Sequence, residues 1–96
     1  MNRTRYLVCY DVSDPKRLRK VAKICESFGS RIQYSVFECP LDQLSCKRLR
    51  SQLDEVINHT ADQVLFVSLG KEDSKSAFRI ESLGLPYTER SRITVI

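Results

Sequence analysis

Ligand pairs for a zinc ion are missing from this sequence. Its four cysteines, Cys9, Cys25, Cys39 and Cys46, form no C-x-x-C pair, and His59 is its one histidine. Structural zinc needs closely spaced Cys and His ligands, so we expect no zinc site. Scattered cysteines are more typical of reduced core residues in a cytoplasmic protein.

Long apolar stretches are missing as well. No apolar run approaches the length of about 18 residues that a membrane span needs. The N-terminal stretch MNRTRYLVCYDV turns acidic too soon for a secretory signal, so we expect a cytoplasmic protein without a membrane span. With 42% hydrophobic and 29% charged residues, residues 1–96 suit one small domain whose stability would gain from association.

Positive charge is unevenly distributed along the chain, whose net charge is +4 at pH 7. Residues 1–50 hold 11 Lys and Arg against 5 Asp and Glu, a balance of +6, whereas residues 51–96 hold 5 against 7, a balance of −2. A local excess of this kind points to an anionic partner at one surface, most commonly nucleic acid. A solvated basic face is the simpler alternative.

The first 28 residues predict a strand followed by a helix. Residues 4–12 (TRYLVCYDV) form an apolar run with two apolar faces, which is typical of a central strand covered on both sides. Asp14 can cap the next helix, and Pro15 suits its first position. An apolar stripe extends the helix over about 15–28, and Gly29 closes it.

The remaining elements are shorter. Residues 31–38 alternate in polarity and predict a second strand that Pro40 ends. Apolar residues at helical spacing predict a second helix over about 42–58. Three further strands are expected over 62–70, 77–84 and, after the break at Pro86, 92–96.

These elements favour an α+β fold, the ferredoxin-like βαββαβ sandwich with an extra short C-terminal strand. In this fold two helices cover one face of an antiparallel sheet and leave the other face bare. Leu7 and Cys9 would lie on the bare face, so we expect a second copy to cover it in a homodimer. The terminal strand within residues 85–96 should pair with a sheet edge, its own or, as we expect, that of the partner subunit.

Asp11 ends the first strand on the same side as Leu7 and Cys9. A dimer axis near this point would bring two Asp11 carboxylates together, and their repulsion favours a cation between them. Mg²⁺ suits such a site because it prefers oxygen ligands and keeps several waters, one of which could attack a phosphodiester. The simpler alternatives are that Asp11 pairs with an arginine or helps to cap the first helix.

The first helix also carries a cationic face without an interleaved acid. Five positive charges are expected on this face, namely those of Lys16, Arg17, Arg19, Lys20 and Lys23. Such a face can neutralise phosphates, although a solvated helix face has the same pattern.

Alternation in the second strand would place two sets of side chains on opposite faces. Ile32, Tyr34 and Val36 should pack on the helices. The other face, with Arg31, Ser35 and Phe37, should look toward Asp11 and a second subunit. Phe37 could stack on a base or, as we favour, fill the dimer interface.

The first forty residues resemble a known family when three motifs are taken together. These are a strand ending in YDVSD, the helical stretch KRLRKVAK, and RIQYSVFEC closely following a glycine. They are similar to the N-terminal half of the CRISPR-associated Cas protein two, of the adaptation module. The resemblance implies a ferredoxin-like homodimer that cleaves single-stranded RNA, or in some members double-stranded DNA, with Mg²⁺ or another divalent cation such as Mn²⁺. It also implies a bridging place between dimers of the partner integrase, Cas protein one, during spacer insertion.

The resemblance also implies roles for individual residues. The metal-binding aspartate of the family falls on Asp11. Other functional residues of the family fall on Tyr10, Arg17, Arg19, Arg31, Ser35 and Phe37. A non-catalytic scaffold whose basic helix faces hold a duplex between integrase dimers is the main alternative. An RNA-recognition module would need exposed aromatic residues in its third strand, and QVLFVSLG lacks that pattern.

Overall fold

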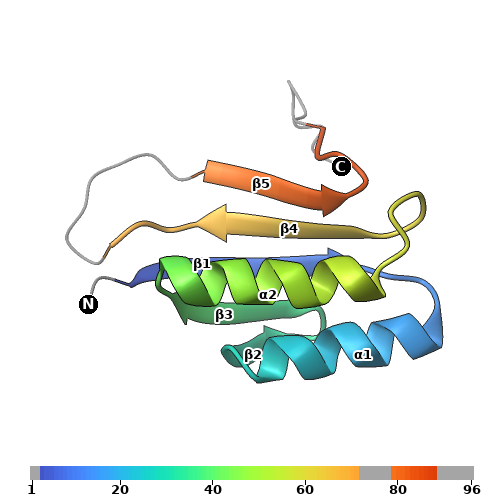
Figure 1. The fold of residues 1–96 in the computed structure, drawn as a ribbon, viewed down its shortest axis with the longest axis horizontal. Helices are drawn as coiled ribbons and strands as arrows, with labels where there is room; N and C mark the ends of the chain where they lie inside the picture. Colours follow the sequence, from blue (N-terminus) through green and yellow to red (C-terminus); the bar gives the residue numbers. More distant parts are fainter. Residues whose placement is uncertain (1–2, 72–78, 89–96) are drawn as a thin grey trace, which may run out of the picture.

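The sheet and two helices form the predicted ferredoxin-like arrangement. The structure is a computed structural model that describes residues 3–71 and 79–88. Its elements are β1 (Thr4–Asp11), α1 (Pro15–Glu26), β2 (Ser30–Gln33), β3 (Val36–Leu41), α2 (Gln43–Val56), β4 (Gln63–Ser68) and β5 (Arg79–Gly84). The sheet is antiparallel throughout, in the order β2-β3-β1-β4-β5, and both helices lie on one of its faces (Figure 1). The predicted α+β fold is therefore confirmed.

The β1–α1 junction follows the local signals of the sequence. The Asp14 carboxylate caps α1 by accepting a hydrogen bond from the Arg17 backbone N–H at 2.9 Å, and Pro15 occupies the first turn. Asp42 caps α2 in the same way, with the Ser45 N–H donating at 2.7 Å. Such caps satisfy backbone donors that have no partner within the helix.

The single strand expected over 31–38 is instead a hairpin. β2 ends at Gln33, Tyr34 and Ser35 form the turn, and β3 follows. The pairing of β2 with β3 also shifts register between Arg31 and Gln33. Because the chain reverses within the predicted strand, side chains before and after the turn do not follow one continuous alternation.

Pro40 does not end the strand, contrary to the prediction. It lies inside β3, opposite Arg5 of β1. β2 pairs with β3 only as far as Glu38, so β3 has a strand on one side only at Pro40. A residue without an N–H group is tolerated at such an unpaired edge.

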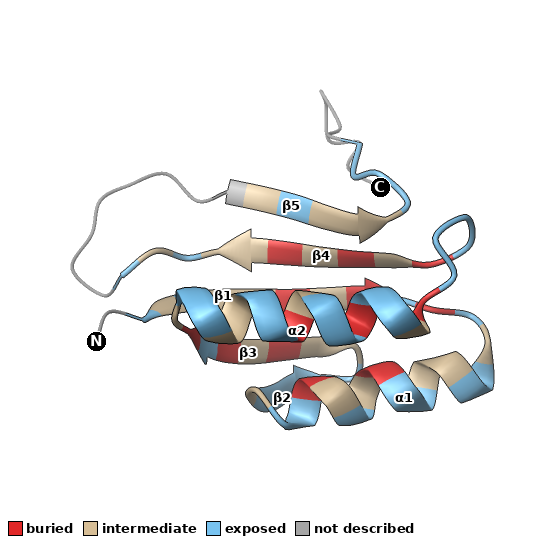
Figure 2. Cartoon of the chain, in the orientation of Figure 1, coloured by how far each residue is buried: buried red, intermediate tan, exposed pale blue. Residues whose placement is uncertain are grey.

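The core fills the space between the sheet and the helices (Figure 2). Alternate residues of β1, β3 and β4 point into it, as expected where one face of a strand is covered. The core side chains are those of Val8, Tyr10, Val12, Val21, Cys25, Phe37, Cys39, Leu41, Leu49, Leu53, Ile57, Val64 and Phe66.

The opposite face of the sheet carries a second apolar surface, which we term the open face. Its side chains are half-buried and adjacent across the strands: Leu7, Cys9, Val36, Leu65, Val67 and Ile80. The expectation that Leu7 and Cys9 lie on a bare face is thereby confirmed.

The C-terminal end of the chain is described only in part. Leu85 to Thr88 leave the sheet without forming a strand. The strand expected over 92–96 lies outside the described residues, so its pairing stays a prediction. None of the helices in the described ranges is long and apolar enough to cross a membrane.

Candidate functional site

Asp11 lies at the end of β1 with its side chain exposed. β1 is paired with β3 on one side and with β4 on the other, where Asp11 faces Gln63. Within residues 3–71 and 79–88, no side chain forms a hydrogen bond or ion pair with the Asp11 carboxylate. Asp14 rather than Asp11 is the helix cap, and none of the described arginines pairs with Asp11, so the described residues support neither of the simpler explanations.

Gln63 is a neighbour of Asp11 that the sequence pattern did not single out. Its side-chain amide donates hydrogen bonds to the carbonyls of Leu85 (3.4 Å) and Pro86 (3.0 Å). These bonds hold the segment after β5 against the end of β4 at which Asp11 lies. Glutamine at the start of a strand carries no local signal for such a contact.

The described residues of one chain do not supply a full ligand set for a metal ion at Asp11. In the described part of the chain, no three His, Cys, Asp or Glu side chains gather into a cluster. A Mg²⁺ ion keeps several waters and uses only one or two carboxylates, so Asp11 fits as a partial ligand. The donor set is suitable if a second copy contributes its own Asp11.

Arg17 is not part of the free cationic face, which corrects the sequence interpretation. Its Nε donates to Asp62 Oδ2 at 2.7 Å, and a terminal nitrogen donates to Asp62 Oδ1 at 3.2 Å. Asp62 has no exposed surface, and its carboxylate also accepts the Asn58 backbone N–H at 2.8 Å. The hydrogen bond from Arg17 holds the pKa of Asp62 below its ordinary value, although burial acts in the opposite direction.

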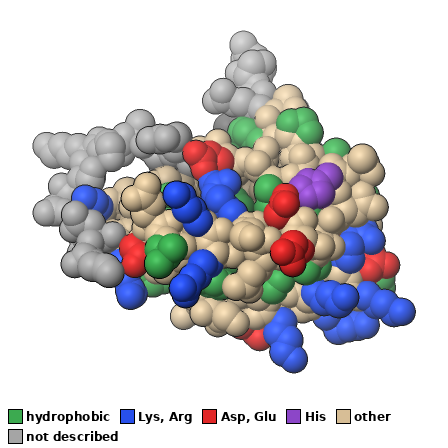
Figure 3. Space-filling model, in the orientation of Figure 1, with side chains coloured by type: hydrophobic (Ala, Val, Ile, Leu, Met, Phe, Trp, Pro, Cys, Tyr) green, Lys and Arg blue, Asp and Glu red, His purple; other side chains and the backbone are tan. Residues whose placement is uncertain are grey.

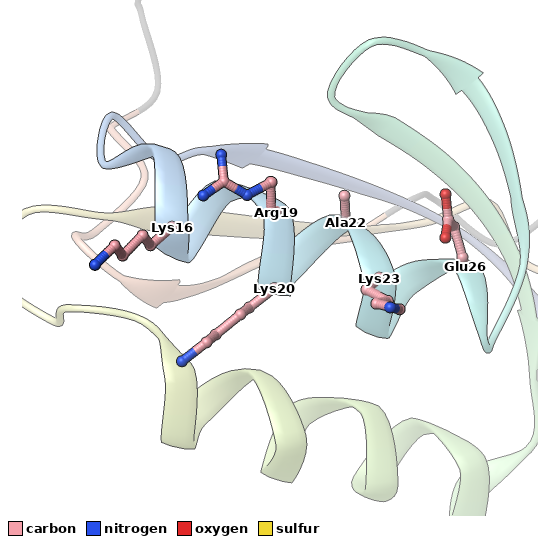
Figure 4. Close-up of a pocket in the computed structure, with 6 residues that line it drawn as sticks. All are labelled: Lys16, Arg19, Lys20, Ala22, Lys23 and Glu26. Carbon is pink, nitrogen blue, oxygen red and sulfur yellow. The ribbon is translucent and has the colours of Figure 1, made fainter.

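The other four cations of α1 lie where the sequence places them. Lys16, Arg19, Lys20 and Lys23 are exposed, and they form no ion pair with any residue that the structure describes. Lys and Arg side chains gather over α1 in Figure 3, and Figure 4 shows the side chains of these four extending from α1. We call this set the α1 cationic face.

Phe37 and Arg31 lie on the helix side of the sheet, not beside Asp11. Phe37 has no exposed surface and belongs to the core, so its predicted place in a dimer interface is wrong. Arg31 pairs with Phe37 in the β2–β3 ladder, and its guanidinium lies 5.1 Å from the centre of the Phe37 ring. Arg31 and Phe37 do share a face, as predicted, but it is the face that the helices cover.

The side chains expected to pack on the helices are also redistributed. Ile32 is 53% exposed and Tyr34 is 77% exposed, while Val36 lies on the open face. Ser35 lies in the turn, where its carbonyl accepts the Tyr10 backbone N–H at 3.0 Å. Ser35 is therefore adjacent to the end of β1, but it lies in a turn and not on either face of a strand.

Tyr10 links the turn to Arg31. Its ring is buried against Phe37, with centroids 6.2 Å apart, and its hydroxyl donates to the Tyr34 carbonyl at 3.4 Å. Burial raises the pKa of Tyr10, and a hydrogen bond with Arg31 acts in the opposite direction. Since Tyr10 and Asp11 are consecutive in β1, their side chains point to opposite faces of the sheet.

Comparison with known proteins agrees with this geometry. Residues 4–77 match the family of CRISPR associated protein Cas2. The chain is 32% identical over 91 residues to a CRISPR-associated endoribonuclease Cas2 of Geobacter sulfurreducens, with 95% of each chain covered. It is 36% identical over 91 residues to CRISPR-associated endoribonuclease Cas2 1 of Rhodospirillum rubrum, covering 95% of this chain and 88% of that one.

A solved structure shares the fold and much of the sequence. The crystal structure of Streptococcus pyogenes Cas2 at pH 6.5 superposes with a TM-score of 0.66 and 40% identity, covering 71% of this chain and 88% of that chain. The family match spans most of the chain, and both relatives named above match 95% of it at more than 30% identity. The chain therefore belongs to the CRISPR-associated Cas2 family.

Proposed function

We propose that this protein is an endonuclease of CRISPR adaptation that hydrolyses phosphodiester bonds with the help of a divalent cation. The observation that carries the proposal is the Asp11 carboxylate, which is exposed and has no partner among the described side chains. An exposed carboxylate at the end of a strand paired on both sides is available to a ligand and held in place. The relatives named as endoribonucleases support this reaction class.

A second copy of the chain would complete the site. The open face holds half-buried apolar side chains from four strands, including Leu7, Leu65 and Val67. Apolar surface of this kind is stabilised by burial against a partner. Asp11 extends the same row of β1 as Leu7 and Cys9, so a homodimer across the open face brings both Asp11 residues to its border.

Each group of the chain has a definite task in this proposal. Asp11 of each subunit would hold Mg²⁺ or Mn²⁺, and such an ion supplies an activated water when bound. The pairing of Asp11 with Gln63 of β4, together with the pairing of the preceding residues of β1 with β3, restrains Asp11 at the position where the ion would bind. The α1 cationic face contacts phosphates of RNA or DNA and retains the nucleic acid.

A scaffold without catalysis is the second candidate, and the α1 cationic face favours it. Four exposed cations on one helix can bind a duplex through its phosphates whether or not Asp11 holds a metal ion. In this form the protein would bridge dimers of the integrase, Cas protein one, during spacer acquisition.

The test is cleavage of RNA and DNA substrates by wild type and Asp11→Asn protein during a Mg²⁺ titration. We expect Asp11→Asn to reduce cleavage by at least about 100-fold, the scale on which loss of one essential catalytic group acts. Asp54→Asn is the matched control, since Asp54 is an exposed carboxylate on α2 with no part in the site. Equal cleavage by wild type and Asp11→Asn would favour the scaffold.

The role of the second copy is tested with Leu65→Lys, which places a charge on the open face. Light scattering at micromolar concentration should give twice the chain mass of 11.1 kDa for wild type and the single mass for the variant. The variant should retain its circular dichroism spectrum and lose cleavage. A wild-type mass equal to one chain would contradict the proposal.

A further inference from the structure

Gln63 faces Asp11 across the ladder between β1 and β4. The two residues are direct partners in the register, so their side chains stand on the same face of the sheet with Cβ atoms about 4.5–5.5 Å apart. Gln63 is half-buried, whereas Asp11 is exposed. A carboxylate and an amide, both of which can offer oxygen atoms, therefore share one border of the open face.

The hydrogen bonds of Gln63 determine which end of its amide is free. Nε2 donates to the Pro86 carbonyl at 3.0 Å and to the Leu85 carbonyl at 3.4 Å. A carbonyl accepts only from the NH₂ end of a side-chain amide, so these two bonds set the orientation of the group. Among the residues that the structure describes, none donates a hydrogen bond to the Gln63 Oε1. Oε1 is therefore a free acceptor on an amide that cannot turn over without losing both bonds.

The carbonyls that hold the Gln63 amide are themselves restrained. The Leu85 N–H donates to the Asp62 main-chain carbonyl at 2.8 Å. Gly84, the residue before it, has a φ of +87°, a conformation that glycine adopts readily and that packs the chain closely on this carbonyl. Proline at position 86 restricts its own φ. The segment after β5 is thus fixed on the start of β4, and this keeps the Gln63 amide in place.

Such an amide suits the surroundings of a divalent cation beside Asp11. Mg²⁺ binds carboxylate oxygens at about 2.0–2.1 Å and keeps several waters. These waters donate their O–H groups outward, and protein acceptors around them orient the whole shell. An amide oxygen is neutral, so it serves as an acceptor without adding to the repulsion between two Asp11 carboxylates.

We propose that Gln63 is a positioning residue of the cation site, whose Oε1 accepts a hydrogen bond from a water in the shell of a divalent cation held by Asp11. The inference rests on the proposed function for the presence of that cation, and it adds a residue that no sequence motif indicated. The bonds from Nε2 orient the amide, and Oε1 acts on the cation through water. In a homodimer each subunit contributes one such acceptor beside its own Asp11.

The experiment measures the binding of Mn²⁺ without a nucleic acid, so that activity plays no part. The electron paramagnetic resonance signal of free Mn²⁺ gives the affinity of wild type, Asp11→Asn, Gln63→Leu and Gln63→Glu at a chain concentration at which light scattering shows equal masses. Gln63→Leu removes the acceptor and the donors together. We expect this variant to bind Mn²⁺ more weakly by roughly 10- to 100-fold, the usual cost of losing an outer-shell partner.

Gln63→Glu separates the effect on the cation from the effect on the segment after β5. The new carboxylate accepts hydrogen bonds but has no N–H to donate to Leu85 and Pro86. We expect Mn²⁺ affinity at least equal to that of wild type, although both of these bonds are lost. Gln52→Leu and Gln52→Glu are matched controls on the exposed side of α2 and should leave the affinity unchanged.

A second readout requires no substitution at Gln63. In ¹H–¹⁵N spectra, Mg²⁺ should shift the side-chain NH₂ signal of Gln63 in wild type and leave it unchanged in Asp11→Asn. The NH₂ signals of Gln43 and Gln52, both on α2, are internal references that should not move. This result is independent of how well the Gln63 variants fold, which circular dichroism verifies separately.

Three outcomes would overturn the inference. Wild-type affinity in Gln63→Leu, with binding lost in Asp11→Asn, would contradict the role of Gln63 and leave that of Asp11 intact. Equal weakening by Gln63→Leu and Gln63→Glu would mean that Gln63 only holds the segment after β5. Absence of Mn²⁺ binding by wild type would overturn both this inference and the cation of the proposed function.

Discussion

Replacement of Asp62 by alanine tests whether the buried ion pair with Arg17 fastens α1 to the loop before β4. Asp62 has no exposed surface, whereas the Arg17 side chain is 28% exposed. Removal of Asp62 deprives the guanidinium of both hydrogen bonds to that carboxylate, leaving it only the Asp14 carboxylate at 3.9 Å, and deprives the Asn58 N–H of its acceptor. Breaking a fully buried pair costs about 3–5 kcal/mol, and water that reaches the exposed part of Arg17 reduces the loss. We expect Asp62→Ala to lower the free energy of unfolding by about 3 kcal/mol.

A loss of this size is measurable by urea or heat. For a chain of about 100 residues, 1 kcal/mol corresponds to about 4–8 °C, so the melting temperature should fall by about 12–24 °C. All variants are compared at the same chain concentration, because association stabilises the folded state. Asp54→Ala removes an exposed carboxylate and should change stability by less than about 0.5 kcal/mol.

The pH dependence of the same variant provides an independent check. The pKa of Asp62 in the folded protein lies below its ordinary value of 3.8. A carboxyl group with a lowered folded pKa adds stability above its unfolded pKa, and this stability is lost as the pH falls through the folded value. The stability difference between wild type and Asp62→Ala should therefore stay constant between about pH 7 and 5 and shrink below about pH 3.8.

Two results would refute this reasoning. The first is a stability difference at pH 3 as large as that at pH 7. The second is additivity in a double-mutant cycle, in which Asp62→Ala and Arg17→Ala together lower stability by the sum of their separate effects. Coupled residues should instead give a double variant that is more stable than this sum predicts, since each single variant leaves a partner unpaired.

Two further predictions follow from close packing and from burial. Gly84 has φ of +87°, and a Cβ there would lie 2.3 Å from the Asp62 carbonyl oxygen. Gly84→Ala should therefore lower the free energy of unfolding by at least about 2 kcal/mol in urea titrations. An unchanged urea midpoint would contradict this packing. Burial raises the pKa of the Cys25 thiol to about 12 and that of Cys39 to about 11. At pH 8 about one Cys25 in 10⁴ is a thiolate. Iodoacetamide should therefore leave Cys25 and Cys39 unmodified in the native protein and modify them in urea, which peptide mass spectrometry would show. Equal rates of modification in both states would contradict the burial of these thiols.

The elements that depend on local signals were predictable from the sequence. The cap at Asp14, the proline at the first turn of α1 and the apolar row of β1 all act within a few residues of the chain. The exposure of Asp11 on the open face follows from alternation along a strand that contains no irregularity. Local rules therefore placed β1, α1 and the candidate metal ligand correctly.

The β2–β3 turn was missed because its residues give only the weak turn signal of Ser35. Tyr34 and Ser35 lie between Gln33 and Val36, with no glycine, proline, asparagine or aspartate among them. Such residues usually mark turns, since they favour the required backbone angles. The turn here is instead held by the two hydrogen bonds from Tyr10, which come from a different strand.

The partner of Arg17 was missed for a similar reason. Asp62 is 45 residues away along the chain, and nothing in its neighbourhood distinguishes a buried carboxylate from an exposed one. Only the packing of α1 beside the loop before β4 brings the two together. A helix face that looks uniformly cationic in sequence therefore contains one arginine committed to the structure and four cations free to contact a ligand.

Strand β1 presents consecutive residues to opposite faces of the sheet. Tyr10 is buried on the helix side, and Asp11 carries its exposed carboxylate on the open face. Asp11 is paired with Gln63 of β4, while Tyr10 is paired with Val64 of β4 and donates its backbone N–H to the Ser35 carbonyl. Asp11 therefore cannot shift relative to the buried core without breaking hydrogen bonds of the sheet. A metal ion held between two Asp11 carboxylates would for this reason sit at a position that the core of each subunit fixes.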